Sequence, residues 1–156
     1  MAESITSQDI EVGIATECRG FFLVSSAPLP RSMQCVVDAF WEAARRIAPA
    51  ISVWHRIQVI FATAPFSIKL SNGELRFIPS NPELIGVTIE NLVFLDCNRI
   101  APLHPQIQVA CVLEELVHAL MHIRDESLVS VVVARLYPGV TLTDGRYTVS
   151  GSLPPT

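Results

Sequence analysis

The chain has 156 residues, of which 50% are hydrophobic and 17% are charged, with a formal net charge of -4 at pH 7. This length and composition allow one domain with a substantial core. They exclude an intrinsically disordered chain, which combines low hydrophobicity with high net charge. The acidic balance and the absence of any Lys/Arg-rich run argue against nucleic acid as a partner, since Lys69 is the only lysine.

The sequence also predicts no membrane partner, because no apolar stretch approaches the roughly 20 residues that span a bilayer. The start of the chain, Met1 to Ser4, lacks the basic and apolar segments of a signal peptide. We therefore expect a cytoplasmic protein. Its four scattered cysteines contain no CxxC pair, so they predict buried thiols rather than a disulfide scaffold or a zinc knuckle.

In the N-terminal third, residues 1–10 are typical of a loose, flexible polar arm. Two apolar segments between Glu11 and Ser25 flank Arg19-Gly20, which predicts a β-hairpin or a bent strand. Two prolines follow, and Ser32 is then a candidate N-cap for a helix that runs to about Ala48.

The middle of the chain is typical of β structure. Residues 55–63 alternate between apolar and polar, as a half-buried strand does, and 85–95 predict a further strand. Between alternating segments, Asn72-Gly73 favours a two-residue hairpin turn, because both residues tolerate positive φ. Residues 80–83 predict another turn.

The C-terminal part contains the strongest helical pattern, over Gln106 to Ile123. A second segment, 126–136, is rich in valines that would also suit a strand, but the acidic residues at its start favour a helix. A short strand is expected around Tyr147, and residues 150–156 are expected to be flexible.

One arc of about 120° on the 106–123 helix carries its polar side chains. An amphipathic helix facing solvent would also have such a stripe. Here, however, the rest of the helix is apolar, so we expect a central helix whose stripe lines a cleft. The stripe has no Lys or Arg, and all of its members except Gln108 and Cys111 are groups typical of metal binding or proton transfer. Its residues are Gln108, Cys111, Glu114, Glu115, His118 and His122.

The spacing Glu114-Glu115-x-x-His118 matches the His-Glu-x-x-His helix of zinc peptidases, with Glu114 in the place of the first histidine. Residues of about 90–140 resemble the ImmA/IrrE-type zinc metallopeptidases. In this comparison 92–98 matches the strand before the active helix, 114–122 matches that helix, and Glu126 with Pro138 matches the following helix. Residues 111–120 are also similar to a bacterial family of unknown function that lacks the zinc-binding pair.

The metallopeptidase resemblance implies specific roles. His118 and Glu126 would be metal ligands, and Glu115 would be the general base. A carboxylate can bind zinc, so Glu114 would be the remaining ligand, in a site that also suits harder ions such as Mn²⁺ or Mg²⁺. Two alternatives stay open: His122 could pair with His118, and Asp125 could replace Glu126 or orient a histidine.

Together these observations predict a single zincin-like α+β domain over residues 1–156. We expect a twisted, mostly antiparallel sheet of four or five strands, a backing helix and a central helix that carries the motif. The predicted function is a metal-dependent hydrolase of the metallopeptidase type that uses zinc or another divalent ion. The alternative is a catalytically inactive zincin-like binding or regulatory module without a metal. In both cases the substrate or partner would be a peptide or protein.

Overall fold

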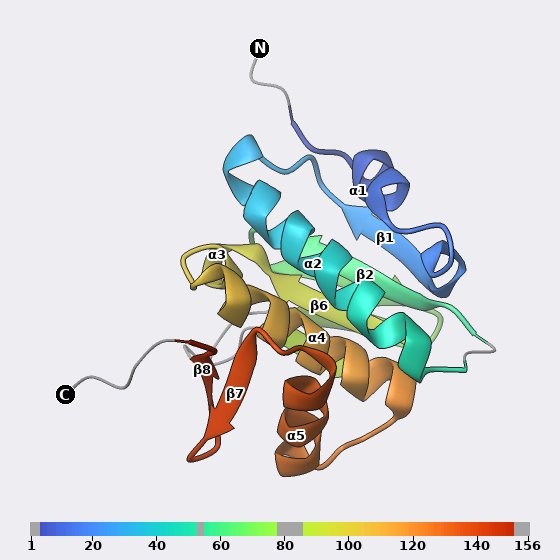
Figure 1. Ribbon diagram of the computed structural model, residues 1–156. Helices are drawn as coiled ribbons and strands as arrows, with labels where there is room; N and C mark the ends of the chain where they lie inside the picture. The colour runs from blue at the N-terminus through green and yellow to red at the C-terminus, as the bar shows by residue number, and fades with distance from the viewer. Residues whose placement is uncertain (1–3, 53–54, 78–85, 152–156) are drawn as a thin grey trace.

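A mixed four-stranded sheet with long helices on one face forms the body of the protein (Figure 1). The structure is a computed structural model that describes residues 4–52, 55–77 and 86–151. The strand order is β1 (Phe22–Ser26), β2 (Ile57–Ala62), β6 (Leu92–Asp96) and β5 (Gly86–Ile89). The fold is therefore α+β, as the sequence predicts.

The main sheet is not mostly antiparallel, in contrast to our prediction. β1 pairs with β2 and β2 with β6 in parallel, and only β5 and β6 are antiparallel. The physical reason is the helix α2 (Gln34–Ile47), which lies between β1 and β2 in the chain and returns it to the same end of the sheet. Five of the six residues of β2 are buried, so side chains on both of its faces are covered, whereas the sequence predicted a half-buried strand.

For the described residues, the prediction of a loose arm over 1–10 followed by a hairpin or bent strand over 11–25 is wrong, because a helix occupies 7–13 and the first strand starts only at Phe22. Helix α1 (Ser7–Gly13) begins at Thr6, whose side chain accepts a hydrogen bond from the Asp9 amide while Asp9 accepts one from the Thr6 amide. This reciprocal capping stabilises a short helix that composition alone does not suggest. Ile5 and Ile10 are buried, so this segment belongs to the core.

Helix α1 also covers the outer edge of β1. A carboxylate oxygen of Glu11 accepts a hydrogen bond from the Val24 amide at 3.1 Å, and the Ser7 hydroxyl accepts one from the Ser26 amide at 2.9 Å. Backbone groups of an edge strand otherwise pair with other chains. One edge of the sheet is thus closed by side chains of the same protein.

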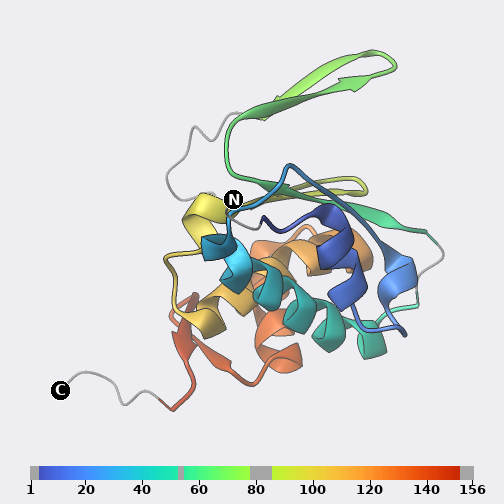
Figure 2. The ribbon, with the colours of Figure 1, turned by 90° about the horizontal axis from the view of Figure 1, so that it is seen from above.

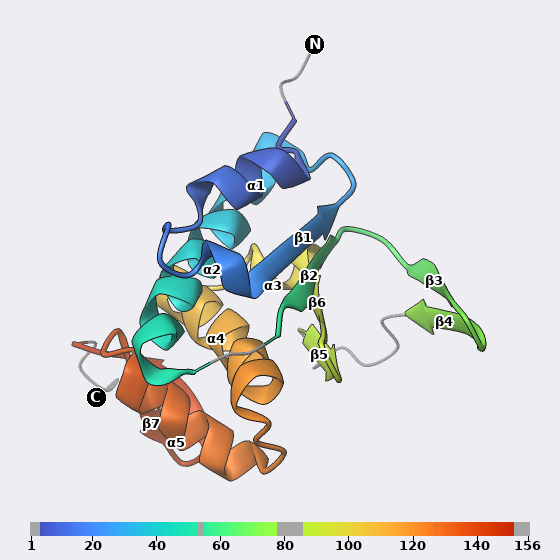
Figure 3. The same cartoon turned by 90° about the vertical axis from the view of Figure 1, so that its right-hand side faces the viewer.

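The helices α2 and α4 (Pro105–Met121) pack against each other and against one face of the sheet (Figures 1 and 3). As predicted, α2 ends before Pro49, but its N-cap is Met33 rather than Ser32. The predicted 126–136 helix is confirmed as α5 (Glu126–Leu136), which follows α4 and contacts it. The short helix α3 (Cys97–Ile100) precedes α4. Large apolar side chains that are fully buried in this core include Phe40, Ile47, Leu113 and Leu116.

The described part of the chain also contains three β-hairpins. The predicted hairpin is confirmed as β3 (Phe66–Leu70) and β4 (Gly73–Phe77), which project from the body (Figures 2 and 3). Its turn residues are Ser71 and Asn72, one position earlier than predicted.

The single strand expected over 85–95 is instead the β5–β6 hairpin, which turns at Glu90 with a φ of 53°. The strand expected near Tyr147 is β8 (Arg146–Val149), and it pairs with β7 (Val140–Thr143). The turn predicted at 80–83 and the flexible tail beyond 151 lie outside the described residues. Within the described part of the chain, no helix is both long and apolar enough to cross a bilayer.

Candidate functional site

Five of the six residues of the polar stripe line a pocket, as the sequence predicts: Cys111, Glu114, Glu115, His118 and His122. The sixth, Gln108, is buried and donates a hydrogen bond to the Ala101 carbonyl. The pocket has a volume of about 780 Å³ and lies between α4, the strand β5 and the loop that joins α4 to α5. Four glutamates and a single arginine line it, so its electrostatic character is acidic, which favours cations. The ionisable residues of its lining are Glu90, Cys111, Glu114, Glu115, His118, His122, Arg124 and Glu126.

The His118 imidazole is held in a defined orientation by the end of its own helix. His122 adopts a left-handed conformation with φ 56° and ends α4, so the chain reverses. The reversal places the Ile123 carbonyl 2.7 Å from His118 Nδ1. Because a carbonyl only accepts, Nδ1 carries the proton, and in the neutral ring Nε2 presents its lone pair. A metal-binding histidine is commonly oriented by this kind of contact.

Nε2 of His118 faces Glu126, the first residue of α5. The distance from His118 Nε2 to Glu126 Oε2 is 3.3 Å, and the Glu126 side chain is 78% exposed. Two ligands bound at about 2.0–2.1 Å to a tetrahedral ion lie roughly 3.3–3.4 Å apart. The separation therefore suits two ligand atoms on one ion. It equally suits a hydrogen bond to the carboxylate from an imidazolium, in which Nε2 also carries a proton.

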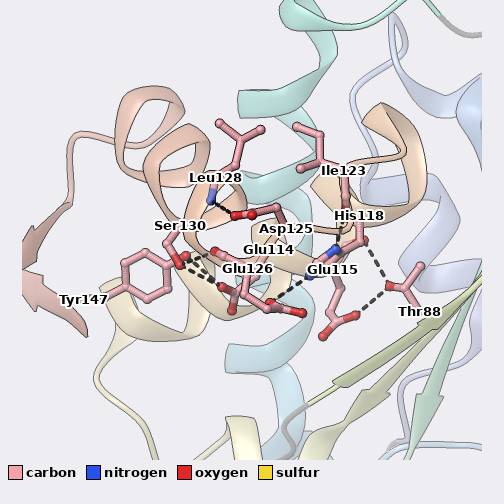
Figure 4. A network of polar contacts seen from close by, with 10 residues as sticks. All are labelled: Thr88, Glu114, Glu115, His118, Ile123, Asp125, Glu126, Leu128, Ser130 and Tyr147. Carbon is pink, nitrogen blue, oxygen red and sulfur yellow. Dashed lines mark hydrogen bonds and ion pairs between the residues drawn. The ribbon is translucent and has the colours of Figure 1, made fainter. Parts of the chain in front are cut away.

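The Glu115 side chain points toward Thr88 of β5 (Figure 4). Its Oε2 accepts a hydrogen bond from the Thr88 hydroxyl at 2.6 Å, and its side chain lies directly over Gly86. Burial raises the pKa of Glu115, and the Thr88 hydrogen bond opposes this effect. A carboxyl group with a raised pKa is suited to exchanging a proton near neutral pH.

Glu114 is held by donors from the C-terminal part of the chain. Its Oε1 lies 3.1 Å from the Tyr147 hydroxyl of β8 and 3.4 Å from the Ser130 hydroxyl of α5 (Figure 4). Burial raises the pKa of Glu114, and the hydrogen bond from Tyr147 opposes it. Burial, assisted by the Glu114 charge, also raises the pKa of Tyr147, so this hydroxyl remains a donor.

The structure brings the predicted residues to one pocket without assembling them around one point. Among the described residues, no group of three or more His, Cys, Asp or Glu side chains is placed to hold a metal ion. His118 and Glu126 lie 3.3 Å apart, while Glu114 is hydrogen-bonded to Tyr147 and Glu115 to Thr88. The donor types fit a divalent ion, but the third donor is turned away.

The two alternative ligands have other contacts. The ring of His122 stacks on that of His55, with 5.5 Å between centroids. Asp125 is the N-cap of α5 and accepts a hydrogen bond from the Leu128 amide at 2.8 Å. His104 caps α4, because its Nδ1 accepts a hydrogen bond from the Gln106 amide at 3.3 Å.

Sequence patterns predicted no role for Thr88, Ser130 or Tyr147, although each forms a hydrogen bond with a predicted site residue. Thr88 and Tyr147 are 27 and 33 positions from their partners, so no local pattern connects them. Ser130 follows Glu126 by one helical turn, and its place on α5 was the only available signal. Cys111 also lines the pocket, and burial raises its pKa to about 12.

The chain was also compared with known proteins. No protein-family model, curated protein or solved structure matches it.

Proposed function

We propose that this protein is a metal-dependent hydrolase of the metallopeptidase type with an altered ligand set. The observation that supports this most directly is the His118–Glu126 pair, whose 3.3 Å separation suits two ligands of one ion. His118 is already in the tautomer that presents Nε2, and the acidic pocket favours a cation. Glu114, one turn before His118, would be the third ligand.

In this proposal Glu115 is the general base. It projects from α4 into the same pocket, where it contacts Thr88 of β5, and burial raises its pKa. A divalent ion, when bound, would polarise the substrate carbonyl and lower the pKa of its water. Glu115 would accept the proton from the attacking water and hold it for the leaving amine, while Thr88 orients its carboxylate.

The free edge of β5 supports a peptide as the substrate. The Gln58 amide of β2 binds the Asn91 carbonyl, so Asn91 directs this group toward β2. Alternate residues of a strand direct their backbone groups to opposite sides, so those of Leu92 and Phe94 face β5. The backbone groups of Gly86 and Thr88 consequently face away from the sheet. Among the described residues no strand pairs with this edge, so an extended peptide could add to it beside Glu115.

Metal analysis tests the proposal. Protein purified without chelator should carry close to one equivalent of Zn²⁺ or Mn²⁺ by elemental analysis, and His118→Ala should lose it. His122→Ala is the matched control, because its ring stacks on His55; it should retain the ion. Glu115→Gln should retain the metal and abolish hydrolysis of a fluorescent peptide library. Absence of metal, with no thermal shift on adding either ion, would reject the hydrolase.

A second function, an inactive binding or regulatory module, is supported by a different observation. Glu114, Glu115 and His118 each have a partner within the protein, as a stable polar cluster without metal requires. In that case Glu115→Gln would leave the biological activity intact. Complete loss of that activity in a folded Glu115→Gln protein would contradict this second function.

A further inference from the structure

The side chain of Glu114 lies beside the His118–Glu126 pair but is drawn away from it. Glu114 precedes His118 by one helical turn and shares its pocket. Yet no group of three candidate ligands is assembled within the described part of the chain. The cause lies on the other side of Glu114, where two hydroxyl groups approach a single carboxylate oxygen, Oε1.

Tyr147 is the main donor of the two. The Ser130 hydroxyl has one proton, and it lies closer to the Glu126 carbonyl, at 3.0 Å, than to Glu114, at 3.4 Å. The Tyr147 hydroxyl lies closer to this carboxylate, with 3.1 Å between its oxygen and Glu114 Oε1. Glu114 lines the pocket, whereas neither donor does, so the donors pull the carboxylate to the pocket wall.

Tyr147 is held in place by a well-anchored hairpin. The Thr141 and Thr148 hydroxyls lie 2.8 Å apart across β7 and β8, and the Ser150 amide donates to the Gly139 carbonyl at 3.0 Å. Val140 is buried, and the Tyr147 ring packs on the core. The hairpin therefore presents the hydroxyl at a fixed position relative to α4.

We propose that Tyr147 is an autoinhibitory latch, which holds Glu114 off the His118–Glu126 pair until the hydrogen bond is released. This inference rests on the proposed function, since it concerns the same ion. A metal that recruits Glu114 must first break a hydrogen bond to a buried carboxylate, and this cost lowers its apparent affinity. A partner that displaces the β7–β8 hairpin would raise the affinity.

The test is to measure Zn²⁺ and Mn²⁺ binding by isothermal titration calorimetry on metal-free protein. Tyr147→Phe removes only the hydroxyl and should bind either ion roughly 10-fold more tightly than the wild type. Tyr137→Phe is the matched control, because Tyr137 is the only other tyrosine and packs by Gly139 and Arg46. Its affinity should equal that of the wild type. Circular dichroism of each metal-free variant checks that the fold is retained.

A second background shows whether the effect passes through Glu114. In Glu114→Gln the third ligand is lost, so adding Tyr147→Phe should no longer increase affinity. If the wild type binds metal and Tyr147→Phe binds it equally or more weakly, the latch is wrong and the hydrolase stands. If neither protein binds metal, both proposals fail. Binding by Tyr147→Phe alone would support the latch most strongly.

Discussion

The contact between Gly86 and Glu115 gives a sharp prediction, because a methyl group added at position 86 has no room. A Cβ atom there would lie 2.7 Å from Glu115 Cγ and 2.9 Å from both Cδ and Oε1. Gly86 is not in a positive-φ conformation, so Gly86→Ala tests this steric contact alone. The Glu115 side chain must move, and its 2.6 Å hydrogen bond from Thr88 must lengthen or break.

We expect Gly86→Ala to destabilise the protein by about 1–2 kcal/mol, the lower part of the range for overpacking, because a flexible side chain can move aside. In a domain of this size 1 kcal/mol shifts Tm by roughly 2–4 °C, so the expected fall is about 2–8 °C. Thermal unfolding followed by circular dichroism measures it. Gly20→Ala is the matched control, because no atom lies within 4 Å of its added Cβ, and it should be neutral.

A double-mutant cycle identifies the partner. In Glu115→Ala the crowded atoms are absent, so Gly86→Ala should then cost almost nothing. An equal cost in both backgrounds would refute the reasoning, because the added methyl would then be in conflict with something other than Glu115. A change in the pH optimum of any hydrolysis would show that the displaced carboxylate is the base.

Three further predictions concern ionisation and capping. Burial raises the pKa of Glu115 in the folded state, so the unfolded chain binds fewer protons than the fold, and stability falls as pH rises through this window. Glu115→Gln should therefore be more stable than the wild type at pH 7. Below the ordinary glutamate pKa of about 4.3 the carboxyl group is neutral in both states, so the two proteins should be equally stable there; a stability difference that persists at this pH would contradict the prediction. Asp125→Ala removes the N-cap of α5 and should cost about 1 kcal/mol in urea unfolding, whereas Ser127→Ala should cost less. Because its pKa is near 12, little of the Cys111 thiol is ionised at pH 8, and it should react slowly with iodoacetamide. Its reaction rate, followed by mass spectrometry, should rise about tenfold per pH unit, whereas a plateau near pH 8.5 would disprove this.

The sequence predicted those helices and hairpins whose formation depends on patterns of residues close together in the chain. The periodic helices α2, α4 and α5 and the β3–β4 hairpin depend on residues near one another in the chain, so their positions could be predicted closely. The same holds for the stripe that places Glu114, Glu115 and His118 on one side of α4, since helical geometry fixes it. The helix α1 was missed because its signal is a single capping pair, Thr6 and Asp9.

Only the tertiary structure decided how the chain pairs its strands and what each site residue contacts. The direction of β1 and β2 follows from the crossover through α2, and strand pattern alone does not encode it. Likewise, the Glu114–Tyr147 and Glu115–Thr88 contacts join residues far apart in sequence, brought together by burial of the apolar faces between them. Glu90 and Arg124, which also line the pocket, were not predicted; the sequence by itself determined only that Glu114, Glu115 and His118 share it. The fold determined that each has a partner there, because a side chain's hydrogen bonds depend on neighbours that only packing supplies.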